Sequence, residues 1–184
     1  MRPLLPVLGM LAALLAGGCD DKDSAANAPP PVALTAEAIG HYCGMALVEH
    51  SGPKGQILLR GSDRPVWFSS ARDAIAFTML AEEAKTLRAI YVSDMGRAET
   101  WDQPGATNWV EARRAHFVVG SDRRGGMGAE EAVPFGERQL AERFASERGG
   151  RVLTFTQIPR DWVLSGDDTP APAPSGAQAP RHIH

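Results

Sequence analysis

The residues best suited to do chemistry lie in the short stretch His41–Tyr42–Cys43–Gly44–Met45. Side chains alternate along an extended backbone, so His41, Cys43 and Met45 are predicted to share one face. Gly44 disfavours a helix there and permits a bend. A thiolate beside a thioether forms a soft site that prefers Cu(I) to Mg²⁺, Ca²⁺ or Mn²⁺, and zinc rarely takes methionine sulfur. The alternative is that Met45 fills the core and Cys43 is a small buried side chain.

A second methionine lies where core packing does not explain it. Met127 belongs to the loop Arg123–Gly128, which has three glycines and no other apolar side chain. Such a loop brings a thioether up to a metal without steric cost. Met127 is therefore a candidate third sulfur ligand, whereas Met79 and Met95 lie in helix and strand contexts and are predicted to be packing residues.

The histidines are further candidates. His50 and His116 are possible ligands, although a single histidine flanked by strand residues is more often a hydrogen-bonded structural group. His182 and His184, at the end of the chain, are interpreted either as a loose Cu(II) or Zn²⁺ site or as a solvated terminus.

The start of the chain predicts export and lipid attachment. Arg2 precedes an apolar run from Leu4 to Leu15 that is too short to span a bilayer. The residues leading to Cys19 resemble the lipobox of bacterial lipoproteins, in which the cysteine becomes the acylated first residue. Asp20 resembles the inner-membrane retention signal of enteric lipoproteins. If Cys19 carries lipid, Cys43 has no disulfide partner in an oxidising compartment. The alternative is an ordinary secretory signal.

Composition and proline placement define the folded part. A net charge of −3 offers no basic footprint for nucleic acid, and two cysteines are too few for a disulfide scaffold or a four-cysteine zinc site. Proline- and alanine-rich segments predict a linker and a tail. The predicted organisation is a signal peptide over 1–18, a disordered linker over 19–35, a folded domain over 36–165 and a disordered tail over 166–184.

A weak internal repeat predicts an α+β fold of two similar ββαβ units, at about 36–100 and 101–165. Phe68 and Phe77 are nine residues apart across the first predicted helix start, as are Phe135 and Phe144 across the second. The first unit is predicted to contain strands 56–60 and 65–68, a helix from Ser69 or Ser70 to about Ala84, and strand 87–93. The second is predicted to contain strands 109–112 and 116–120, a helix over 136–148 and strand 151–157.

In this repeat, Gly126–Met127 precedes Phe135 as Gly44–Met45 precedes Phe68. The repeat therefore predicts that the two units face each other across one site.

Together these motifs resemble the NosL family. The resemblance spans Ile39 to Phe155 and is carried by Cys43–Met45, Phe68–Ser70, Tyr91–Asp94, Val119–Asp122, Gly126–Gly128 and Pro134–Phe135. It implies a fold of two similar small α/β halves, distantly like the organomercurial lyase. It also implies that Cys43, Met45 and Met127 are the copper ligands.

The resemblance further implies a membrane-tethered, non-enzymatic Cu(I) metallochaperone that faces the periplasm. Its acceptor would be nitrous oxide reductase, an enzyme of denitrification, or the membrane complex that assembles the reductase's copper centres. Cys43 would bind as thiolate and lose its proton, and a partner's ligands would replace the two neutral thioethers. Trp67, Trp101 and Trp109 would either shield the metal or pack in the core. The tether would raise the effective concentration near the acceptor.

Two other classes stay open. One is a lipoprotein interaction module in which Cys43 is structural. The other is a cysteine hydrolase with Cys43 as nucleophile and His116 as base. The hydrolase is disfavoured because Glu49–Gly55 contains Ser51, Gly52 and Pro53 where a helix should follow the nucleophile.

Overall fold

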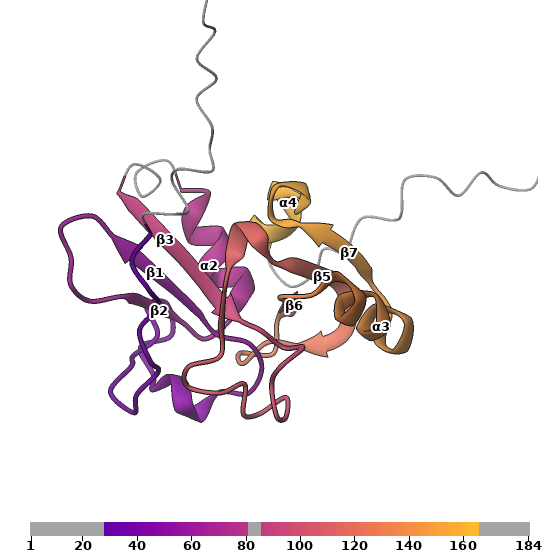
Figure 1. Ribbon diagram of the computed structural model, residues 1–184, viewed down its shortest axis with the longest axis horizontal. Helices are drawn as coiled ribbons and strands as arrows, with labels where there is room; N and C mark the ends of the chain where they lie inside the picture. The colour runs from indigo at the N-terminus through magenta and orange to yellow at the C-terminus, as the bar shows by residue number, and fades with distance from the viewer. Residues whose placement is uncertain (1–27, 81–85, 166–184) are drawn as a thin grey trace, which may run out of the picture.

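The computed structural model describes residues 28–80 and 86–165. The predicted signal peptide, Cys19 and the predicted tail with His182 and His184 lie outside this range. Within it, two antiparallel sheets enclose a helix (Figure 1). No helix in the described part is long and apolar enough to cross a membrane.

The first sheet has the strand order β2-β1-β3-β4. Its strands are β1 (Gly55–Leu59), β2 (Val66–Phe68), β3 (Leu87–Ser93) and β4 (Trp109–Glu111), all paired antiparallel. Alternation places Ile57, Ile90 and Val92 on the buried face. Helix α2 (Ala71–Thr78) packs on this face, and the Ser70 hydroxyl at its N-cap accepts from the N–H of Asp73.

Helix α2 ends at Thr78, so the prediction that it runs to about Ala84 is wrong. The Thr78 hydroxyl donates to the carbonyl of Ile75 at 2.7 Å, a local bond that competes with helical backbone bonding. The N–H groups of Met79 and Leu80 donate to carbonyls three residues back, as is usual in a tightened last turn.

The second sheet has the order β6-β5-β7, with β5 (His116–Arg124), β6 (Glu130–Phe135) and β7 (Arg151–Thr154), and it packs against α3 (Arg138–Arg148). This is the arrangement β2-β1-β3 repeated. The Phe68 and Phe77 rings lie 5.3 Å apart, and those of Phe135 and Phe144 lie 5.2 Å apart. The predicted α+β fold of two ββαβ units is confirmed.

The strands of the second unit differ from those predicted. Segment 109–111 joins the first sheet as β4, and 116–124 is the first strand of the second unit, followed by β6. The sequence did not reveal β6 because Pro134 lacks an N–H and Glu131 is charged. The structure accommodates the proline because β6 is an edge strand. Residues 155–157 form the 3-10 turn η3, whose capping box at Thr154 ends β7.

Gly126–Met127 lies between β5 and β6, at the position that the β1–β2 turn holds in the first unit. Gly44–Met45 precedes β1 altogether. The predicted equivalence of these two segments is therefore wrong, although both lie near the junction of the two units.

The main hydrophobic core lies between the two sheets and includes α2 and the C-terminal helix α4 (Arg160–Leu164). Arg72 is 5% exposed, and its guanidinium donates to the carbonyls of Trp162, Val163 and Ser165 at 2.7, 3.3 and 2.6 Å. Its Cζ also lies 4.7 Å from the centre of the Trp162 ring. Arg72 thereby fixes α4 to the core.

Residues 28–34, called here the N-terminal strap, lie on the outer face of the first sheet. The Gln56 side chain, which is fully buried, exchanges two 2.8 Å hydrogen bonds with the backbone of Val32. The Tyr91 hydroxyl donates to the carbonyl of Pro29, and the N–H of Leu34 donates to that of Ala106. The buried amide needs such partners, so this part of the predicted linker is docked on the sheet.

Candidate metal centre

Cys43 lies in a closed turn. The N–H of Gly44 donates to the carbonyl of Gly40, and the N–H of Gly40 donates to that of Met45, both at 2.9 Å. Gly44 has φ +66°, the left-handed conformation that glycine adopts without strain. The prediction that His41, Cys43 and Met45 share one face of extended backbone is therefore wrong, because the chain turns at these residues.

The Cys43 thiol folds back over Gly40. A Cβ atom at position 40 would lie only 2.5 Å from Cys43 Sγ, so glycine at this position makes room for the sulfur. Cys43 is half-buried and forms no disulfide. The turn thus presents the thiol at the edge of the fold.

His41 packs against aromatic rings. Its ring lies 5.8 Å from the Phe68 ring and 5.5 Å from the Phe77 ring, edge-on to both. His41 therefore packs against the aromatic pair of the first unit, and this packing holds the Cys43 turn against α2.

His50 approaches Cys43 instead. Its Nε2 lies 3.8 Å from Cys43 Sγ, and its Nδ1 lies 3.2 Å from the carbonyl oxygen of Gly126. Since a carbonyl only accepts, we assign the ring proton to Nδ1, which leaves the Nε2 lone pair facing the thiol. His50 thereby links the Cys43 turn of the first unit to the Met127 loop of the second. The signal for this role was the turn sequence Ser51–Gly52–Pro53, which separates His50 from any strand.

Gly126 allows the Met127 loop to approach this closely. A Cβ atom there would lie 2.7 Å from His50 Cβ and 3.0 Å from the carbonyl oxygens of Ser51 and Ser69. These contacts are too short for any side chain, so glycine lets three backbone segments meet. The next residue, Met127, is 53% exposed, and Met45 is 39% exposed. Both methionines are therefore at the surface, Met45 in the Cys43 turn and Met127 next to the glycine that contacts His50.

Two buried charged side chains support these loops from beneath. Lys54 is 1% exposed, and its Nζ donates to the carbonyls of Ser51 and Gly52 at 3.0 and 2.6 Å. Burial lowers the pKa of Lys54 to about 8, although the charges of Glu131 and Asp102 act in the opposite direction. Lys54 therefore holds the segment that follows His50.

Glu131 lies against the Met127 loop and is bonded to the start of α2. Its Oε1 accepts from the N–H groups of Arg72 and Ala132, both at 2.9 Å, and from the Ser70 hydroxyl at 3.3 Å. Burial raises its pKa to about 7 despite these donors. Its Oε2 lies 2.7 Å from where a Cβ of Gly125 would stand. Sequence reasoning missed both charges; the available signal was a charged residue within an apolar strand region.

The remaining predicted residues lie elsewhere. His116 begins β5, and the Met127 loop follows the other end of that strand, about 25 Å away at roughly 3.3 Å per residue. The hydrolase pairing of Cys43 with His116 is thus not formed. Met79 packs on the main core and Met95 on the smaller core cluster, as predicted. Within 28–80 and 86–165, no three His, Cys, Asp or Glu side chains form a metal-binding group.

The three tryptophans that were candidates to shield the metal lie in two places. Trp101 lies beside the segment after His50, since its carbonyl accepts from the N–H of Gly52 and its ring contacts that glycine. Trp67 and Trp109 pair with each other at 5.9 Å, and Trp109 packs on the outer face of the first sheet. Trp101 therefore covers the segment after His50, whereas Trp67 contacts the Cys43 turn through its backbone, since its carbonyl accepts from the N–H of His41.

The Cys43 turn carries a set of exposed apolar side chains. Ile39, Tyr42, Met45 and Val48 are between 39% and 56% exposed, in one segment around the thiol. Exposed apolar side chains gathered in this way are typical of a docking surface. We call these four residues with Met127 the apolar rim.

Comparison with known proteins now identifies the family. The model of the NosL family matches residues 31–163. The chain belongs to the NosL family. It is 48% identical over 171 residues to the copper-binding lipoprotein NosL of Achromobacter cycloclastes, covering 92% of this chain and 88% of that one. It is 35% identical over 152 residues to the copper-binding lipoprotein NosL of Stutzerimonas stutzeri, covering 81% and 78%.

A solved NosL structure has the same fold. The crystal structure of the copper chaperone NosL from Shewanella denitrificans superimposes with a TM-score of 0.67 at 34% identity, covering 72% of this chain and 98% of that one. In the present chain, one thiol and one imidazole are in contact at the unit junction, and the exposed residues Met45 and Met127 lie in the two segments that meet there. A donor set of this softness suits monovalent copper.

Proposed function

We propose that this chain is a lipid-anchored Cu(I) metallochaperone in which Cys43, Met45 and Met127 hold the metal. The observation that carries the proposal is the contact chain from Cys43 Sγ to His50 Nε2 and from His50 Nδ1 to the carbonyl of Gly126, the residue before Met127. It brings two segments more than 70 residues apart in the sequence to one junction. The names of the NosL relatives support copper as the cargo.

Delivery is proposed to proceed by ligand exchange. The Cys43 thiolate supplies the strongest bond and releases its proton on binding. The two thioethers are neutral and exposed, so an acceptor's ligands can reach the metal and replace them in turn. No bond of a substrate is made or broken, and the chain is therefore proposed to act without catalysis.

The acceptor is proposed to be nitrous oxide reductase or the membrane complex that assembles its copper centres. The apolar rim supports docking of a protein at the metal, because its side chains surround the thiol and remain exposed. Attachment through acylated Cys19 would hold the chain at the periplasmic side of a membrane, and Asp20 favours the inner one. The tether would raise the effective concentration of the chaperone near a membrane-bound acceptor.

An anaerobic Cu(I) titration of the chain from Asp20 onward, in competition with a chromogenic chelator, tests the proposal. The wild type should bind copper, and Cys43→Ser should lower the affinity by at least the roughly 100-fold that the loss of a supporting group can cause. Unchanged competition by Cys43→Ser would overturn the proposed site.

Substitution of the methionines distinguishes a copper chaperone from an interaction module with a structural Cys43. Met45→Leu and Met127→Leu should each lower Cu(I) affinity by about tenfold, while Met79→Leu, the matched control in the core, should leave it unchanged. Full affinity in both rim variants would instead favour an interaction module with a structural Cys43. Copper transfer from the loaded chain to copper-free nitrous oxide reductase, measured after separating the two proteins, tests the acceptor.

A further inference from the structure

The Met127 loop is rich in glycine. Five residues lie between the end of β5 at Arg124 and the start of β6 at Glu130, and three of them are glycines. Glycine loses more conformational freedom than any other residue when its backbone becomes fixed. If this loop were free, a metal that binds Met127 would have to order it, and the cost of that ordering would weaken binding. A tight metal ligand in this loop therefore requires loop ends that are already fixed.

The two strand ends that carry the loop pair with each other. Arg124 and Glu130 are partners in the β5–β6 register, and Arg124 Nη1 lies 3.9 Å from Glu130 Oε1. The N–H of Gly125 donates to the carbonyl of Ala129 at 2.9 Å. The Arg124 side chain is 54% exposed, and an exposed ion pair contributes little to stability. These contacts close the hairpin but do not fix it to the rest of the molecule.

A tryptophan of α4 fixes the β6 end of the loop. The indole Nε1 of Trp162 donates to Glu130 Oε2 at 2.8 Å, and Trp162 is 2% exposed. A hydrogen bond to a carboxylate is stronger than one between neutral groups. The Arg72 guanidinium, which stacks on the Trp162 ring, also donates to the carbonyl of Glu130 at 3.4 Å. Glu130 is thereby attached to α4 and α2 through both its side chain and its backbone.

A second tryptophan fixes the β5 end. The Cζ atom of Arg123 lies 5.1 Å from the centre of the Trp101 ring, which is a cation–π contact. Trp101 packs on the smaller core cluster, and its ring also lies against Gly52, two residues after His50. The Trp101 ring therefore touches both the strand that leads into the Met127 loop and the segment that follows His50.

We propose that Trp101 and Trp162 are positioning residues for copper, which fix the two ends of the Met127 loop so that its thioether meets the metal without further ordering. The inference depends on the Met127 ligand proposed above. The two indoles act through Arg123 and Glu130 and do not themselves bind the metal. Groups that orient metal ligands from outside the coordination sphere typically contribute about 10- to 100-fold to metal affinity.

Trp162→Phe tests the stronger contact, because it keeps an aromatic ring beneath Arg72 and removes the indole N–H. In the metal-free chain, amide hydrogen exchange should become faster at Gly125 and Gly128, whose N–H groups bond within the loop. In an anaerobic Cu(I) titration against a chromogenic chelator, the variant should bind about tenfold more weakly than wild type. Unchanged exchange and unchanged affinity would overturn the inference.

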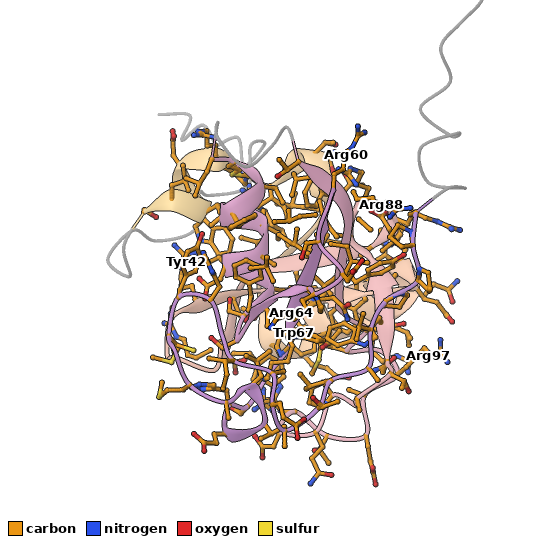
Figure 2. All side chains as sticks on the ribbon, turned by 90° about the vertical axis from the view of Figure 1, so that its left-hand side faces the viewer. Tyr42, Arg60, Arg64, Trp67, Arg88 and Arg97 are labelled. Atoms are coloured by element: carbon orange, nitrogen blue, oxygen red, sulfur yellow. The ribbon has the colours of Figure 1, made fainter. Side chains whose placement is uncertain are left out.

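Trp109→Phe is the matched control. The indole Nε1 of Trp109 also donates a hydrogen bond, to the carbonyl of Ala106 at 3.0 Å, and its ring pairs with Trp67. Figure 2 shows Trp67 in front of the first sheet, with the second sheet behind it. Trp109→Phe therefore removes an indole hydrogen bond away from the Met127 loop. It should leave both the loop exchange and the copper affinity unchanged.

Variants of the two partner residues test each contact without changing a tryptophan. Glu130→Gln keeps an oxygen that accepts from Trp162 and should bind copper as wild type does, whereas Glu130→Ala removes the acceptor and should match Trp162→Phe. Arg123→Gln removes the cation beside Trp101 and should weaken Cu(I) binding about threefold. Equal affinities for Glu130→Gln and Glu130→Ala would contradict a role for the indole hydrogen bond.

A double-variant cycle with Met127→Leu shows whether the indole acts through the methionine. Trp162→Phe should lower the Cu(I) affinity of the wild type and leave that of Met127→Leu unchanged. An equal loss in both backgrounds would overturn the inference, because the indole would then support only the fold. Normal copper binding by Met127→Leu would overturn the proposed ligand together with this inference. A weakened Met127→Leu beside an unaffected Trp162→Phe would overturn this inference alone.

Discussion

The turns between the first two strands of each unit occupy the same place in the repeat but do different work. Counting back from the paired phenylalanines Phe68 and Phe135, Gly61 corresponds to Gly128 and Arg60 to Met127. The two glycines share left-handed backbone, with φ +77° and +84°, and a Cβ atom added to either would have no neighbouring atom within 4 Å. The repeat therefore fixes the shape of the turn.

The difference lies in what surrounds each turn. The turn of the first unit is exposed and carries arginines, whereas that of the second unit lies against Glu131 at Gly125 and touches the His50 segment through Gly126. One copy of the unit thus supplies a charged surface and the other a metal-facing loop. The residues packed against each turn therefore determine its role more than its backbone conformation does.

The largest expected effects come from the paired phenylalanines. Phe68→Ala and Phe135→Ala should each lower the free energy of unfolding by about 3–5 kcal/mol, since both rings are buried. Only Phe68 also supports His41, so Phe68→Ala should weaken Cu(I) binding and Phe135→Ala should not. Urea denaturation and Cu(I) titration measure the two quantities. Equal loss of copper affinity in both variants would contradict the separate roles of the units.

Glu131→Gln tests the buried carboxyl beneath the Met127 loop. The folded-state pKa of Glu131, about 7, is raised above its ordinary value of 4.5, so its contribution to stability is full below pH 4.5 and is lost as the pH rises through 7. This loss amounts to about 3 kcal/mol. Urea denaturation between these pH values should show a flatter pH dependence in Glu131→Gln than in wild type. Parallel curves would argue against a buried, neutralised carboxyl.

The smallest effect separates the two turns directly. Gly126→Ala should cost about 1–3 kcal/mol because its Cβ would overlap His50 and two backbone oxygens. Gly61→Ala, the control in the other turn, should cost about 1 kcal/mol through its backbone conformation alone. Thermal unfolding gives the stabilities, and Cu(I) affinity should fall only for Gly126→Ala. Unchanged copper affinity in Gly126→Ala would show that the Met127 loop is not part of the copper site.

Much of the fold could be predicted because large aromatic residues recur at the same positions in the two units. The nine-residue phenylalanine spacing marks both ββαβ units, and β3 lies where its β-branched run predicts it. Strand β6 could not be predicted, because a buried Glu131 and an edge-strand Pro134 both violate the local pattern. Their places depend on α2 and β5, which are distant in sequence.

The sequence singles out the residue types proposed for the site, but it does not predict their geometry. The sulfur residues stand out locally, since Met127 lies in a glycine loop and Cys43 beside Met45. The approach of His50 to Cys43 depends on Gly126 of the other unit, so no local pattern reveals it. The docking of the strap could not be predicted locally either, because its partner Gln56 becomes buried only when the sheet forms.

The buried Arg72 guanidinium makes the core depend on the C-terminal helix α4. Three of its acceptors are carbonyls of Trp162, Val163 and Ser165, so a chain that ends before Trp162 would bury this cation without them. Leaving a buried charge unpaired costs several kcal/mol. The core between the sheets is therefore complete only when α4 is in place, and removal of this short last helix should destabilise the whole domain and not its C-terminal end alone.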